Sequence, residues 1–163
     1  MELPDPSIFL RKLFAAVEGG GIITAPLVLD HVCYRVESVE RYTEWMHHLS
    51  KNGSLLGEHL IGRRPIATFK LKAPFIFQGR AVEVIELPSP KEGRPYVEGW
   101  EHAEFVVGED PRVFAKRYPS LNWDVSGADK PVNADVRLSY EGFSVKFHER
   151  SLEEVIAREN ARR

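Results

Sequence analysis

Apolar residues in the first 26 positions recur at helical spacing: Ile8, Phe9, Leu13, Phe14 and Val17. Asp5 is suited to the N-cap of such a helix, and Pro6 is suited to its first position. Three consecutive glycines at 19–21 then interrupt the pattern. Segment 1–26 therefore predicts an N-terminal helix followed by a linker.

From residue 27 onward the pattern changes to short runs that are typical of strands, with one helix among them. The run 27–36 is rich in β-branched and aromatic residues and predicts a strand. Ser38 can cap a helix that Gly53 closes, with Val39, Tyr42, Met46 and Leu49 on its apolar face. Three more strands are predicted at 54–61, 66–71 and 80–88. The order of elements in this part of the chain is βαβββ.

A similar order begins again after the Pro- and Gly-rich linker 88–99. The run 100–107 predicts a strand, Asp110 and Pro111 open a short helix, and Pro119 ends it. Strands are predicted at 132–140 and 143–148, around a Glu-Gly turn. The repeat needs one more strand between 119 and 132, where strand-forming residues are few. The spacing of Ser151 and Glu154 is that of a capping box and predicts a C-terminal helix.

The fold class predicted from these elements is α+β. Two tandem βαβββ modules are expected to form a curved, mostly antiparallel sheet around a cleft, with an added helix at each end. Each module is short for an independent core, so the two should share one. We therefore expect a single domain, 1–163: helix and linker 1–26, first module with its linker 27–98, second module 99–150 and C-terminal helix 151–163.

Composition excludes several classes of function. The 22 basic and 24 acidic side chains give a net charge of -2, which argues against nucleic-acid and membrane binding. No apolar run approaches the ~20 residues that span a bilayer, and the N-terminus lacks the pattern of a signal peptide, so a cytoplasmic protein is expected. The sequence also lacks the Gly-rich motifs of nucleotide-binding proteins and the GxSxG motif of serine hydrolases.

Histidines at matching positions of the two modules suggest a metal site. His31 and His102 lie in the first strands of the two modules, and His148 lies in the last strand of the second. With a single cysteine, Cys33, any metal must be held by histidines and carboxylates. Three imidazoles and one carboxylate would suit a divalent zinc, nickel, iron or manganese ion.

The carboxylate of this site has two candidates, both in the strand 80–88. Glu86 lies 7 residues after the turn glycine Gly79, and His148 lies 6 residues after the turn glycine Gly142, so these two match to within one residue. Glu83 and Lys146 each lie 4 residues after the same glycines and therefore match as well. Strand alternation places the two glutamates on opposite faces. If Glu83 faced inward it could form a salt bridge with Lys146 instead of a metal site, so the residues alone leave both readings open.

Other polar residues could line the cleft. Glu104 shares a strand face with His102 and could support a ligating imidazole or act as a general base. A cationic rim for an anionic substrate could come from Arg35, Arg64, Lys70 and Lys146. Each of these five side chains is equally compatible with an ordinary surface role.

Five segments of the chain stand out together: LDHVCYRV, GRRPIATFKL, VIELPSPKEG, GWEHAEFV and VKFHERSLEEVI. In combination they resemble the bacterial YecM-like family, a branch of the glyoxalase, bleomycin-resistance and extradiol-dioxygenase (vicinal oxygen chelate) superfamily. The resemblance implies paired βαβββ modules and a metal site in the cleft. It matches the family pattern at His31, Glu86, His102 and His148, and it favours Glu86 over Glu83; Lys146 and Glu104 match as well.

Three functions are compatible with this resemblance. The first is a metal-dependent lyase, isomerase or dioxygenase that acts on a small oxygen-rich molecule chelated by the metal. The second is a protein that binds or sequesters a small molecule without chemistry. The third is a structural or partner-binding module that uses the C-terminal helix and the ENARR tail. Fold kinship does not choose among them, and whether the protein is an enzyme stays open at this point.

Overall fold

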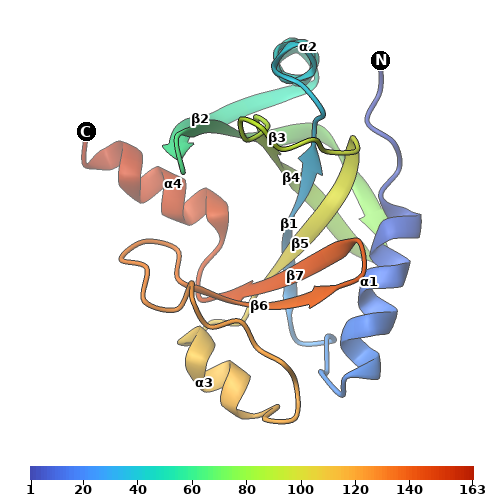
Figure 1. Ribbon diagram of the computed structural model, residues 1–163, viewed down its shortest axis with the longest axis vertical. Helices are drawn as coiled ribbons and strands as arrows, with labels where there is room; N and C mark the ends of the chain where they lie inside the picture. The colour runs from blue at the N-terminus through green and yellow to red at the C-terminus, as the bar shows by residue number, and fades with distance from the viewer. The chain divides into compact units, whose positions relative to one another are not determined.

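A computed structural model describes residues 1–163 and confirms the α+β class, with four helices and seven strands (Figure 1). The helices are α1 (Ser7–Gly19), α2 (Val39–Asn52), α3 (Pro111–Lys116) and α4 (Leu152–Ala161). The strands are β1 (Val28–Arg35), β2 (Gly53–Ile61), β3 (Arg64–Phe77), β4 (Arg80–Pro88), β5 (Gly99–Val106), β6 (Asp135–Tyr140) and β7 (Phe143–His148). The chain divides into two compact units: unit 1 comprises Met1–Pro6 and His31–Glu101, and unit 2 comprises Ser7–Asp30 and His102–Arg163.

Unit 1 contains most of the first predicted module: β1 from His31 onward, followed by α2, β2, β3 and β4. Its strands lie in the order β2-β3-β4-β1, with β2, β3 and β4 antiparallel and β4 parallel to β1. This confirms the βαβββ order for residues 28–88. Strand β3 is longer than predicted, because it resumes its pairing with β4 at Phe75 after an irregularity that follows Lys70.

Helix α2 packs one apolar face and is fixed at both ends. The Ser38 hydroxyl accepts the amide of Arg41 at 3.1 Å, as expected for an N-cap. Gly53 ends the helix, and a Cβ there would lie 2.5 Å from the carbonyl oxygen of Lys70, so only glycine allows β3 to approach this closely. The buried face differs from the prediction: Val39 is exposed, whereas Trp45 is buried and packs edge-on against Tyr34.

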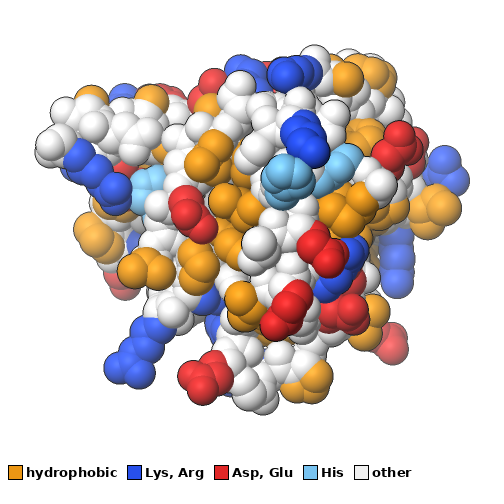
Figure 2. Space-filling view, turned by 90° about the horizontal axis from the view of Figure 1, so that it is seen from above, with side chains coloured by type: hydrophobic (Ala, Val, Ile, Leu, Met, Phe, Trp, Pro, Cys, Tyr) orange, Lys and Arg blue, Asp and Glu red, His pale blue; other side chains and the backbone are white.

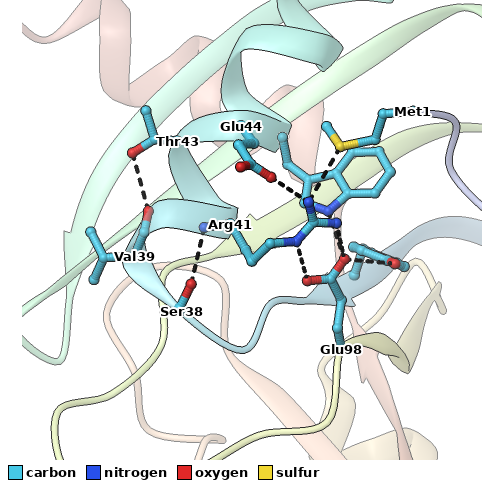
Figure 3. Close-up of polar contacts among 9 residues, drawn as sticks. Met1, Ser38, Val39, Arg41, Thr43, Glu44 and Glu98 are labelled. Carbon is cyan, nitrogen blue, oxygen red and sulfur yellow. Dashed lines mark hydrogen bonds and ion pairs between the residues drawn. The ribbon is translucent and has the colours of Figure 1, made fainter.

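Glu98 fastens the linker before β5 to helix α2 within unit 1 (Figure 3). Its carboxylate accepts hydrogen bonds from Arg41 Nε at 3.0 Å and Nη2 at 2.6 Å, and from the indole nitrogen of Trp45 at 2.9 Å. The Tyr34 hydroxyl donates to the same carboxylate at 3.3 Å. The hydrogen bonds from Arg41 hold the pKa of Glu98 below its usual value, and burial raises the pKa of Tyr34 to about 12.

Replacement of Glu98 by glutamine should lower the free energy of unfolding near pH 7 by about 2 kcal/mol, because charge-assisted hydrogen bonds are lost. A carboxyl with a lowered folded-state pKa stabilises the fold above its unfolded-state pKa. That contribution is lost as the pH falls through the folded-state value. Urea unfolding between about pH 7 and pH 3 should therefore be less steeply pH-dependent in the variant.

The exposed Glu44, which also contacts Arg41, supplies the control Glu44→Gln. Parallel pH profiles for the wild type and Glu98→Gln would contradict this prediction.

Unit 2 holds β5 from His102 onward, then β7 and β6 in that order, with β5 parallel and β6 antiparallel to β7. Phe105 and Phe147 form its apolar face, against which Phe14 of α1 and Phe114 of α3 pack at ring distances of 5.3 and 4.9 Å. The buried residues of α1 follow the i, i+3, i+4, i+7 pattern: Leu10, Leu13, Phe14 and Val17. Ile8, predicted to face inward, is exposed because it lies outside this stripe.

The second module lacks the extra strand that the repeat required between 119 and 132. That segment contributes only an isolated bridge between Asp124 and Arg137. Its polar residues satisfy the backbone locally: the Asp124 carboxylate accepts the Ser126 amide at 2.9 Å, and a turn joins Ala128 to Val125. Strand β6 also begins later than predicted, at Asp135, because Asn133 has a left-handed backbone with φ of 51°.

Basic and acidic side chains are intermingled on the face shown in Figure 2, as expected from the nearly equal numbers of the two in the sequence. None of the four helices has the length and apolar character required to cross a membrane.

Candidate metal-binding residues

His31 and Glu86 lie together in unit 1. The parallel register pairs His31 with Val84 and Cys33 with Glu86, so both candidate ligands project from the same face of neighbouring strands. His31 Nε2 lies 3.8 Å from Glu86 Oε2, and the His31 side chain is fully buried. Two ligands of one tetrahedral ion, each about 2.1 Å from it, are roughly 3.4 Å apart, so the pair is close to ligand spacing.

Glu83, the alternative carboxylate, lies in a different environment. Its carboxylate is 3.3 Å from Lys70 Nζ, and both side chains are more than one-third exposed. Glu83 therefore forms a surface ion pair with Lys70, whereas Glu86 is the carboxylate beside His31.

In unit 2, a buried carboxylate lies at the centre of a polar cluster. The β5–β7 register pairs Glu104 with Lys146, which places His102, Lys146 and His148 on the same face as Glu104. Glu104 Oε1 is 3.2 Å from His102 Nε2 and 3.4 Å from Lys146 Nζ. Glu104 Oε2 is 3.6 Å from His148 Nδ1. Three potential donors thus surround a carboxylate that is only 3 % exposed.

His148 lies between two oxygen atoms that the sequence analysis did not identify. Its Nδ1 is 2.8 Å from Asn133 Oδ1, and its Nε2 is 3.3 Å from Asp30 Oδ2. The same Asp30 oxygen accepts the Leu152 amide at the start of α4, at 2.9 Å. Asp30 immediately precedes His31 in the DH pair, which was its only signal in the sequence. Asn133 belongs to a loop and had none.

The strand registers correct the pairing of positions between the two modules. His31 lies opposite Val84, and His102 lies opposite Ser144, so two residues further on the counterpart of Glu86 is Lys146. Counting from turn glycines suggested His148 instead. That count failed because the hairpin arms differ in length: Val84 is five residues after Gly79, and Ser144 is two after Gly142.

The four cations predicted to bind substrate all have partners within their own units. Arg35 lies 3.2 Å from Glu101, and its guanidinium is 4.3 Å from the ring centroid of Tyr96. Arg64 donates to the carbonyl of Ser89 at 2.9 Å. Lys70 and Lys146 contact Glu83 and Glu104 as described above. Arg35 shares the strand face of His31, since both lie at odd positions of β1.

Each unit has a parallel strand pair that carries a buried histidine, and this arrangement of elements has a counterpart among solved structures. The chain is similar to the solved structure of a putative dioxygenase from Bacillus subtilis, with a TM-score of 0.51. This match covers 77% of this chain and 41% of the other at 10% identity, and it shows the fold alone.

The family follows from closer matches. The YecM protein family matches residues 3–139, so the chain belongs to the YecM family. Protein YecM of Escherichia coli (strain K12) is 30% identical over 156 residues, covering 86% of this chain and 83% of that protein. A solved structure from structural genomics, protein EC4020, has a TM-score of 0.78 and 32% identity over 93% of this chain and 87% of the other.

Proposed function

We propose that this protein binds one divalent metal ion through His31, Glu86 and His102 and presents it to a small oxygen-rich molecule. The observation that carries the proposal is the buried His31 beside Glu86, with 3.8 Å between the potential ligand atoms. His102, at the matching position of the second module, is the further imidazole that the sequence predicts. Two imidazoles and one carboxylate leave coordination positions for water or substrate on zinc, iron, nickel or manganese.

His148, which the sequence predicted as a ligand, is not included in this proposed set. Both of its ring nitrogens face protein oxygens, those of Asn133 and Asp30. Metal coordination through either nitrogen would require one of these contacts to be given up. We propose that His148 instead orients Glu104, whose second oxygen lies 3.6 Å away.

The proposed reaction type is that of a lyase, isomerase or dioxygenase. When bound, the metal would act as a Lewis acid toward two neighbouring oxygens of the substrate. Glu104 would accept or return a proton, since its carboxylate is buried and Lys146 holds it in place. Lys146 would stabilise negative charge beside that carboxylate. A protein that binds the same molecule without turnover would retain metal and ligand affinity and show no product.

The contrast between Glu86 and Glu83 tests the ligand set. Glu86→Gln should weaken binding of zinc by about ten- to a hundredfold, because the charged ligand is lost, whereas Glu83→Gln removes the same charge and should leave affinity nearly unchanged. Calorimetric titration of metal-free protein with zinc measures both. Equal affinities for the two variants would contradict the assignment of Glu86.

A further inference from the structure

Arg35 lies on the same face of β1 as His31 and is oriented by two neighbours. Its guanidinium lies over the ring of Tyr96, and one terminal nitrogen contacts Glu101 at 3.2 Å. Stacking uses the flat face of a guanidinium, so its edge nitrogens keep their donors for a further acceptor. The side chain is 32% exposed, so that edge can be reached.

Tyr96 lies in the linker before β5, and the hydrogen bonds of Glu98 anchor this linker. Two residues further on, Glu98 is bound by Arg41, as Figure 3 shows. Trp45 and Tyr34 also donate hydrogen bonds to Glu98. Tyr34 precedes Arg35 in β1, so a single hydrogen-bonded cluster anchors both the linker and the strand. The ring and the guanidinium are therefore positioned before any ligand binds, which reduces the ordering cost of binding.

We propose that Arg35, oriented by Tyr96, binds a carboxylate at the end of the ligand distant from the metal. This inference rests on the proposed metal site at His31 and Glu86. Cys33 lies beside Glu86 in the register, and Arg35 follows two residues later, roughly 7 Å along the strand. The ligand class is thus a small molecule with two metal-chelating oxygens at one end and a carboxylate about 7 Å away.

Two hydroxamates test this arrangement on the zinc-loaded protein. Benzohydroxamic acid chelates metal through two neighbouring oxygens, and 4-carboxybenzohydroxamic acid adds a carboxylate at the opposite end of the ring. The wild type should bind the carboxylate probe at least about tenfold more tightly than the neutral probe. Arg35→Met should abolish this preference and leave the affinity for the neutral probe unchanged. Tyr96→Leu should lower the preference by about threefold.

Arg94→Met, in the exposed part of the same linker, is the control of matched charge and should keep the full preference. Thermal unfolding checks each variant, and Arg35→Lys replaces Arg35→Met if the latter does not fold; it should lose most of the preference because lysine lacks the planar donor edge. Failure of zinc or the neutral probe to bind would refute the proposed function itself. If the wild type bound zinc, and bound the two probes with equal affinity, the inference about Arg35 would be overturned and the proposed metal site would not. An undiminished preference in the arginine variant would also overturn it.

Discussion

The His31→Ala and His102→Ala variants should each bind zinc at least about a hundredfold more weakly than the unsubstituted chain. Each substitution removes one imidazole from the proposed ligand set. His31 is fully buried beside Glu86, and His102 contacts the buried Glu104. Zinc titration of metal-free protein by calorimetry measures the affinities, and circular dichroism verifies that each variant is folded.

His47→Ala is the appropriate control, because His47 is an exposed histidine on α2. It removes the same side chain and should leave zinc affinity unchanged. If the His31 and His102 variants bound zinc as tightly as the His47 variant, the ligand assignment would be wrong even though the fold is of the expected type.

Asp30→Ala should lower the free energy of unfolding by about 3 kcal/mol. The Asp30 carboxylate lies 3.3 Å from the ring of the fully buried His148 and accepts the first amide of α4. Its removal leaves the Leu152 amide at the helix N-terminus without this acceptor, and it removes the carboxylate beside the buried imidazole of His148. Urea unfolding at neutral pH measures the difference.

Asp129→Ala is the matched control for this prediction. Asp129 is 87% exposed and contacts only the surface residue Arg112, so the loss should not exceed about 1 kcal/mol. Equal losses for the two aspartates would show that the contact between Asp30 and His148 contributes no more than a surface ion pair.

Much of the fold could be predicted because local signals and tertiary structure agree. Ser38 and Ser151 cap α2 and α4 as their spacing indicated. The strand at 119–132 was expected only from the symmetry of the repeat, and local Asp and Ser contacts replaced it. Repeat symmetry predicts the order of elements, but it does not determine whether each segment can form a strand.

The candidate site was predictable where a residue shares a strand face with its partner. Alternation along β5 placed Glu104 with His102, and alternation along β4 separated Glu86 from Glu83. Asp30 and Asn133 were missed because they reach His148 from a different strand and from a loop, respectively. Strand register, which depends on hairpin length, determines such contacts, and the sequence pattern does not encode it directly.

Metal content of the unsubstituted protein tests the central claim most directly. Chain purified without added metal, stripped with a chelator and then titrated with zinc should take up about one ion, as measured by elemental analysis after removal of free metal. One ion per chain, lost on substitution of His31, is the predicted result. A chain that retains no ion after such titration would contradict the account.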